Sequence, residues 1–343
     1  MEMAPSTAPV AGSSLLVDSY GRTIRDLRVS VTDRCNYKCV YCRTGNAGAL
    51  YPELSNSEYL RLIGVFVSLG INKVRLTGGE PLLRKGLVEL VRELAALRTL
   101  DGQPLDLALT TNGHLLAELA VPLRQAGLNR VTVSMDAVSP EIFERITRVP
   151  GSFSAVLSGI RAALAAGLAP LKINCVLMRG FNDSQIEPFV HFGSREGVVV
   201  RFIEFMPLDE GRLWTPEMVV PLNEVVERIR RTLPLVELAA REPGETARRY
   251  GLPDERGEIG IVAPVTQAFC GACSRIRLTS DGKIRTCLFS HIEHDLYGRL
   301  RAGATDDELR SYIHGTASKK EARHRIGEPD FLSPSRSMVH IGG

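Results

Sequence analysis

The sequence lacks the features of a membrane-bound or secreted protein. In the 343-residue sequence, no apolar stretch approaches the roughly 20 residues that a membrane helix needs. Residues 1–14 are rich in Ala, Pro and Ser, without the basic region and apolar run of a secretory signal. We therefore expect a cytoplasmic protein that does not bind membranes and begins with a disordered leader over residues 1–17.

An excess of charge of one sign is also missing. The chain has 42 basic and 39 acidic residues and a net charge of +3, which argues against a general nucleic-acid binder. The phosphate-binding loop G-x-x-x-x-G-K-[ST] does not occur. A bound nucleotide would therefore have to be held by charged side chains instead of by such a loop.

Short β-like runs alternate with helical runs over the first two thirds of the chain. We predict strands at 27–31, 73–77, 106–111, 130–135, 171–178 and 198–205, and helices at 57–69, 85–97, 115–126, 154–166 and 183–196. Strict alternation of this kind predicts a parallel sheet with right-handed crossovers. We expect an α/β fold, a partial (βα)6 barrel of the TIM type, with catalytic groups at the carboxyl ends of its strands.

The composition changes after Pro207. The segment that follows is richer in Glu, Arg and Pro and contains one predicted helix, at 222–231, and the end of the chain is basic and less regular. We expect the barrel to span residues 18–207 and a C-terminal region, residues 208–343, to close its open side.

Six of the seven cysteines form two tight triplets, Cys35, Cys39 and Cys42, and Cys270, Cys273 and Cys287. Disulfide frameworks spread their cysteines over small secreted chains, so these triplets indicate metal or cluster ligands. Three thiolates can hold three irons of a cubane cluster and leave the fourth iron open to a small molecule. Structural zinc is the alternative, although it needs a fourth ligand, such as His291 or His294 at the second triplet. The remaining Cys175 is interpreted as a buried core thiol.

Several predicted strands carry cations on one face. Alternate residues of a strand share a face, so Lys73 and Arg75 point the same way, opposite to Val74 and Leu76. Buried cations need anionic partners, and an inward carboxylate such as Glu204 is one alternative. Cations from four strands instead predict a polyanionic ligand, with a triphosphate as the natural candidate; they are Arg28, Lys73, Arg75, Lys172 and Arg201.

The first triplet, Cys35-x3-Cys39-x2-Cys42 with Tyr41 before its last cysteine, resembles the signature of radical S-adenosylmethionine enzymes. The resemblance implies a 4Fe–4S cluster that binds S-adenosylmethionine and cleaves it to a 5′-deoxyadenosyl radical. Paired glycines after the second strand would let the backbone approach this ligand closely. The implied S-adenosylmethionine contacts are Tyr41, Thr77, Gly78, Gly79, Glu80, Thr111, Ser134 and Met206.

The second triplet narrows this resemblance. Cys270-x2-Cys273-x13-Cys287, the neighbouring Arg275 and Arg277, and the terminal Gly342-Gly343 are together similar to the GTP 3′,8-cyclase family, from about Ser19 onward. That family catalyses the first step of molybdenum cofactor biosynthesis. The resemblance implies a second 4Fe–4S cluster facing the guanine of GTP, and catalytic roles for Arg275, Arg277, Gly342 and Gly343. The implied GTP contacts are Arg28, Lys73, Arg75, Lys172, Arg201, Arg275 and Arg277.

In the activity implied by this resemblance, the radical takes hydrogen from C3′ of GTP and the C3′ radical attacks C8 of guanine. The partners implied are an electron donor such as a flavodoxin or ferredoxin, the cyclic pyranopterin monophosphate synthase as the next enzyme, and a second copy of the chain in a homodimer. Two alternatives stay open. A radical peptide maturase with an auxiliary cluster would need a peptide groove and no ring of cations, and a zinc-stabilised binding protein would use both triplets structurally.

Overall fold

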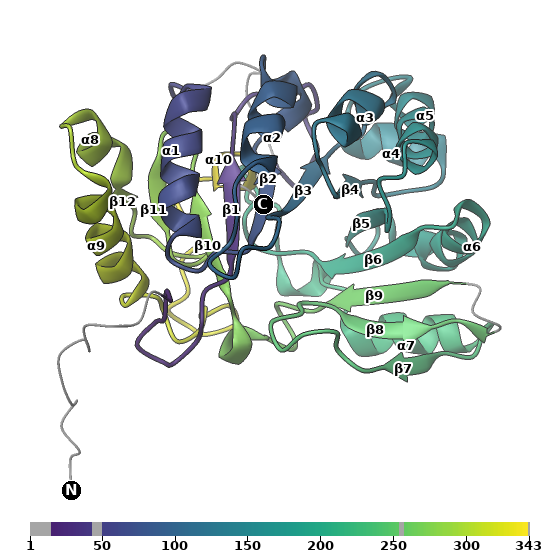
Figure 1. Cartoon of the computed structure of the whole chain (residues 1–343). Helices are drawn as coiled ribbons and strands as arrows, with labels where there is room; N and C mark the ends of the chain where they lie inside the picture. The colour runs from purple at the N-terminus through teal and green to yellow at the C-terminus, as the bar shows by residue number, and fades with distance from the viewer. Residues whose placement is uncertain (1–14, 43–49, 254–256, 342–343) are drawn as a thin grey trace, which may run out of the picture.

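The computed structural model describes residues 15–42, 50–253 and 257–341. Gly342, Gly343 and most of the expected leader lie outside the described residues. The described strands form one curved sheet of 12, in the order β12-β11-β10-β1-β2-β3-β4-β5-β6-β9-β8-β7 (Figure 1). The sheet is not closed, which confirms the predicted partial barrel.

The centre of the sheet consists of the six predicted strands, each paired in parallel with the next. Every observed end lies within one residue of its prediction. The strands are β1 (Asp26–Ser30), β2 (Lys73–Thr77), β3 (Asp106–Thr111), β4 (Arg130–Ser134), β5 (Lys172–Leu177) and β6 (Val199–Glu204).

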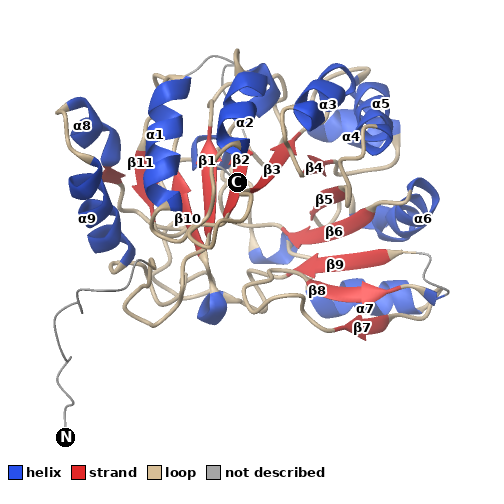
Figure 2. Cartoon of the chain, viewed as in Figure 1, coloured by secondary structure: helices blue, strands red, loops and turns tan. Residues whose placement is uncertain are grey.

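Helices cover the outer face of these strands (Figure 2). They are α1 (Asn56–Val67), α2 (Leu87–Ala95), α3 (Leu116–Gln125), α4 (Pro140–Thr147), α5 (Ser152–Ala165) and α6 (Ile186–Glu196). On β2, Val74 and Leu76 are buried in the apolar core that these helices share, which leaves Lys73 and Arg75 for the inner face. The sequence prediction missed α4, although Ser139 caps it through the Ile142 N–H and Pro140 opens it, both common start signals.

The C-terminal region extends the sheet at both edges. One edge receives β7 (Val236–Leu238), β8 (Arg248–Gly251) and β9 (Glu258–Val262), with α7 (Leu222–Arg230) beside them; the other receives β10 (Arg275–Leu278), β11 (Lys283–Arg285) and β12 (His294–Asp295). Because β9 runs parallel to β6 and β10 runs parallel to β1, the region lengthens the barrel wall itself.

Three further helices follow, α8 (Leu296–Arg301), α9 (Asp306–Ala317) and the short α10 (Met338–Ile341). Of the described helices, none has the length and apolar character needed to cross a bilayer.

Candidate active site

Both cysteine triplets line one cavity inside the curve of the sheet. The first triplet follows the carboxyl end of β1. The second lies lower on the wall, because Cys273 precedes β10 and Arg275 of that strand is in register with Asp26 at the start of β1. The cavity therefore runs along the strands, with one triplet toward each end.

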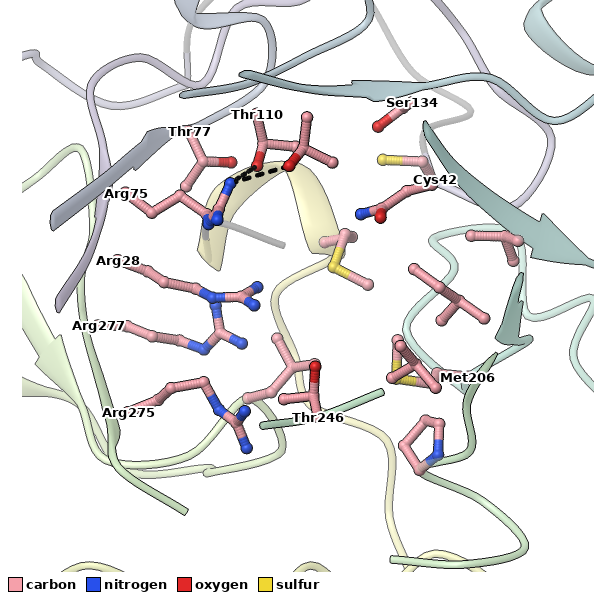
Figure 3. Close-up of a pocket in the computed structure, with 18 of the residues that line it drawn as sticks. Arg28, Cys42, Arg75, Thr77, Thr110, Ser134, Met206, Thr246, Arg275 and Arg277 are labelled. Carbon is pink, nitrogen blue, oxygen red and sulfur yellow. Dashed lines mark hydrogen bonds between the residues drawn. The ribbon is translucent and has the colours of Figure 1, made fainter. Parts of the chain in front are cut away.

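A row of arginines lies between the two triplets. In the strand register, Arg28 is opposite Arg277 on one side and Arg75 on the other. Figure 3 shows Arg75, Arg28, Arg277 and Arg275 one below another along one wall, with Met206 across the cavity. The strand faces predicted that Arg28 and Arg75 point inward, and the resemblance added Arg275 and Arg277. The structure places all four along one cavity.

The loop of the first triplet docks on the paired glycines after β2. The Gly79 N–H donates to the Thr32 carbonyl at 2.8 Å and the Glu80 N–H donates to the Arg34 carbonyl at 2.7 Å. A Cβ atom on Gly78 would lie 2.2 Å from the Thr32 oxygen, and one on Gly79 would lie 2.2 Å from the Arg34 oxygen. Glycine is thus required at both positions because the backbone of the cysteine loop itself packs against them, whether or not a ligand does so too.

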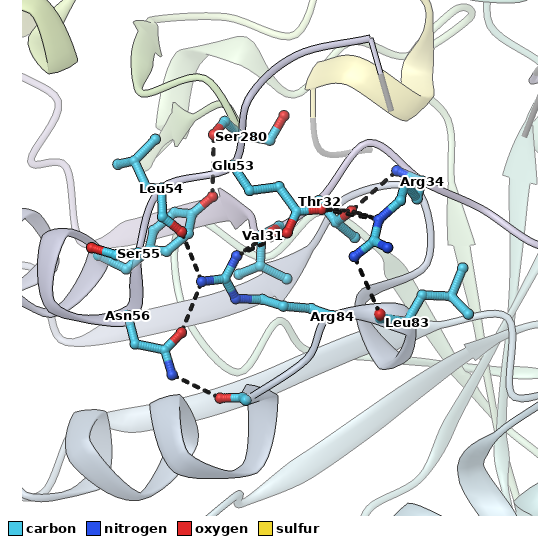
Figure 4. A network of polar contacts seen from close by, with 12 residues as sticks. Val31, Thr32, Arg34, Glu53, Leu54, Ser55, Asn56, Leu83, Arg84 and Ser280 are labelled. Atoms are coloured by element: carbon cyan, nitrogen blue, oxygen red, sulfur yellow. Dashed lines mark hydrogen bonds and ion pairs between the residues drawn. The ribbon is translucent and has the colours of Figure 1, made fainter. Parts of the chain in front are cut away.

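A buried arginine, Arg84, also holds this loop in place (Figure 4). Arg84 forms an ion pair with Glu53 at 3.3 Å, and Glu53 also pairs with Arg34 at 3.2 Å, directly before Cys35. Arg84 further donates to the carbonyls of Val31 at 3.0 Å and Leu54 at 2.8 Å and to the Asn56 side chain at 2.8 Å. The network fixes the end of β1, where the triplet begins, against the segment before α1.

Seven of the eight expected S-adenosylmethionine contacts line the cavity: Tyr41, Thr77, Gly78, Gly79, Thr111, Ser134 and Met206. Glu80 is fully buried beneath them. It accepts hydrogen bonds from the Thr111 hydroxyl at 2.7 Å and from the backbone N–H of Asn112 at 2.6 Å. Burial raises the pKa of Glu80 to about 7. Glu80 thus joins the end of β2 to the end of β3.

Asp136 is a cavity residue that the sequence interpretation missed. Its carboxylate accepts a hydrogen bond from the Tyr41 hydroxyl at 2.7 Å and another from the Val176 N–H at 2.8 Å. Burial raises the pKa of Asp136 to about 6 despite these donors. Its position two residues after Ser134 was an available signal, since alternate residues share a face.

The cations crowd one another. Burial, reinforced by neighbouring arginines, lowers the pKa of Arg28 to about 10, of Arg75 to about 9 and of Lys172 to about 7. In the described part of the chain, none of these three has a carboxylate within 4.0 Å. Glu204 does not neutralise them, because its oxygens accept from the backbone N–H groups of Leu222, Val265 and Thr266. Uncompensated buried cations are the mark of an anion site.

Lys73 and Lys172 lie at the lower end of this array. They line an adjoining cavity at the amino ends of the strands, which shares Arg28, Arg75 and Arg201 with the main one. The expected triphosphate contacts therefore extend from the middle of the barrel toward its amino end.

The second triplet has cations of its own. Burial alone would raise the pKa of the Cys273 thiol, but Arg275 and Lys320 outweigh it and lower that pKa to about 7. The Arg275 guanidinium lies 3.2 Å from the Cys273 sulfur, and Lys320, which is 4% exposed, donates to the Arg275 carbonyl at 2.9 Å. The sequence interpretation missed Lys320, because its partner Arg275 lies on another element of the fold.

A structural zinc ion at either triplet would need a fourth ligand beside the three thiolates. A cubane cluster binds each thiolate through a different iron. His291 does not complete the second triplet, since its ring contacts the Leu332 carbonyl at 3.0 Å and it does not line the cavity.

Known proteins match the chain over nearly its whole length. The radical SAM superfamily matches residues 29–193, and the family described as Molybdenum Cofactor Synthesis C matches residues 198–326. The GTP 3′,8-cyclase of Corynebacterium glutamicum is 43% identical over 98% of this chain and 91% of its own. The chain belongs to the GTP 3′,8-cyclase family. Further cyclases of the family are 40% identical in Arabidopsis thaliana, where the enzyme is mitochondrial (96% of this chain, 84% of the relative), and 47% identical in Xanthomonas axonopodis pv. citri (83% and 86%).

Solved structures agree on the fold of this cyclase family member. SuiB of Streptococcus suis bound to S-adenosylmethionine superposes with a TM-score of 0.59 at 13% identity, over 87% of this chain and 69% of SuiB. SuiB bound to the precursor peptide SuiA gives a TM-score of 0.60 at 14% identity, over 86% and 67%. As a radical S-adenosylmethionine enzyme, the cyclase uses a 4Fe–4S cluster and S-adenosylmethionine.

Proposed function

We propose that this enzyme converts GTP to (8S)-3′,8-cyclo-7,8-dihydroguanosine 5′-triphosphate, the first step of molybdenum cofactor biosynthesis. The observation that carries the proposal is the single cavity with a cysteine triplet toward each end and a row of arginines between them. Arg28, Arg75 and Lys172 have no carboxylate within 4.0 Å among the described residues. A peptide site would not need such cations, so they favour a nucleoside triphosphate over a peptide as the substrate.

Cys35, Cys39 and Cys42 would hold the 4Fe–4S cluster. When bound, the cluster and S-adenosylmethionine supply the 5′-deoxyadenosyl radical that takes the hydrogen from C3′ of GTP. The cavity residues Tyr41, Thr77, Gly78, Gly79, Thr111, Ser134 and Met206 would contact S-adenosylmethionine. Glu80 fixes the ends of β2 and β3 that carry Thr77 and Thr111, so its part in this site is to position them.

Cys270, Cys273 and Cys287 would hold a second 4Fe–4S cluster, and Arg275 and Lys320 support it by stabilising the Cys273 thiolate that a cluster requires. Arg275 and Arg277 would then lie beside the guanosine. The phosphates would extend toward Arg28, Lys73, Arg75, Lys172 and Arg201, which can grip them by charge and, for arginine, through paired hydrogen bonds. Holding GTP at both ends places C3′ and C8 for reaction and excludes water from the radical.

A division into residues 18–207 for S-adenosylmethionine and 208–343 for the second cluster follows from the change in composition after Pro207. Further parts of the proposal rest on the family alone: a catalytic role for Gly342 and Gly343, and a homodimer. They also include a flavodoxin or ferredoxin as electron donor and cyclic pyranopterin monophosphate synthase as the next enzyme. Cysteines that serve as cluster ligands have to stay reduced, which favours a reducing compartment such as the cytoplasm.

The test uses anaerobically reconstituted enzyme, S-adenosylmethionine, a strong reductant and GTP deuterated at C3′. The 5′-deoxyadenosine formed should gain one deuterium, measured by mass spectrometry. Unlabelled 5′-deoxyadenosine, formed at the same rate without GTP, would show that GTP is not the substrate.

A further inference from the structure

The segment 241–246, between β7 and β8, lines the adjoining cavity where the cations Lys73 and Lys172 lie. It brings two carboxylates to this cationic site. Glu242 forms an ion pair with Lys73, and Glu245 lies 4.0 Å from Arg201. Acidic side chains therefore occupy the end of the cavity toward which the phosphates of GTP would extend.

The two carboxylates are held very differently. Glu245 is half-buried, with its side chain 9% exposed; it accepts the Arg241 N–H at 2.8 Å and also lies 4.0 Å from Arg249. The Glu242 side chain is 51% exposed, and its ion pair with Lys73 is its single ion pair in the described part of the chain. Exposed ion pairs are weak. Glu245 is thus a fixed part of the wall, and Glu242 is free to leave Lys73.

We propose that Glu242 competes with the terminal phosphate of GTP for Lys73. Without nucleotide, the Glu242 carboxylate neutralises Lys73; when the triphosphate binds, a phosphate oxygen replaces it and Glu242 turns to solvent. This inference rests on the proposed function. The cyclised product keeps its triphosphate, so the returning carboxylate favours product release in the same way that it opposes GTP binding.

The competition predicts an unusual effect, because removing a charged side chain from the site should tighten binding. Glu242→Gln keeps the size of the side chain and removes its charge. We expect the Kd for GTP to fall about five-fold, the strength of an exposed ion pair. GDP lacks the terminal phosphate that would displace Glu242, so its affinity should change less. The effect should vanish when Glu242→Gln is combined with Lys73→Met, because there is then no cation to compete for.

Anaerobic calorimetry with GTP and GDP tests this on the reconstituted enzyme, with equal iron content as the check on folding. Glu196→Gln is the matched control, since Glu196 pairs with Arg161 and lies in neither cavity. Unchanged or weaker GTP binding by Glu242→Gln would overturn the inference, as would an equal gain in the Lys73→Met background. If the wild-type enzyme itself binds no GTP, the proposed function fails first.

Discussion

GTP binding should be accompanied by uptake of a proton at Lys172. Burial, followed by the charges of Arg201, Arg130, Arg241 and Arg75, lowers the pKa of this lysine to about 7. At pH 8 about one tenth of the lysine is then protonated in the free enzyme. The negative charges of a bound triphosphate favour the ammonium form and move its pKa back toward 10.5. Binding at pH 8 should therefore take up most of one proton.

The direction of the pH dependence of GTP binding follows from the same change in the pKa of Lys172. Because GTP prefers the protonated lysine, affinity should fall as pH rises above 7, by up to about tenfold per pH unit until the pKa of the complex is reached. The assay is anaerobic calorimetry at pH 8 in two buffers of different ionisation enthalpy, such as HEPES and Tris. At that pH the phosphates of GTP are already ionised, since their last pKa is near 6, so they contribute little.

Lys172→Arg separates charge from titration. An arginine keeps the positive charge but stays protonated at pH 8, so GTP binding should persist while the buffer-dependent heat disappears. The reasoning is refuted if the wild-type enzyme takes up no proton at pH 8, or if Lys172→Arg takes up as much as the wild type.

Three further substitutions test the residues around the cavity. Gly79→Ala should lower the iron content and destabilise the fold by about 2 kcal/mol, because the new Cβ would lie 2.2 Å from the Arg34 carbonyl oxygen. Gly64→Ala is the control, since its Cβ would meet nothing within 4 Å, and equal losses in both variants would show that the close contact at Gly79 is unimportant. Arg84→Met should cost about 3 kcal/mol by leaving its buried partners unsatisfied, seen as a lower Tm and less iron; a wild-type Tm would show that the Arg84 network is dispensable. Arg277→Ala should retain iron but lose GTP turnover, and normal turnover would remove Arg277 from the site.

Local pattern was enough to predict the central strands and the inward cations. On β2, for example, alternation alone assigned Val74 to the helices and Arg75 to the interior, and both assignments hold. Pattern did not predict that β9 and β10 would join the two edges, because pairing between strands so far apart in sequence depends on the whole fold. Lys320 and Glu242 were missed for the same reason: each has a meaning only beside partners that other elements supply.

The position of β10 beside β1 has a consequence for how the protein is made. Asp26 pairs with Arg275, so the outer edge of the first strand is covered only after about four fifths of the chain has been made. Until then the nascent barrel presents backbone N–H and C=O groups along β1 and β6, which is a template for aggregation. Such long-range pairing also slows folding. Because β1 to β9 are made before β10, the wall carrying the second triplet joins the barrel after its other strands, and the reaction chamber takes shape late in the synthesis of the polypeptide.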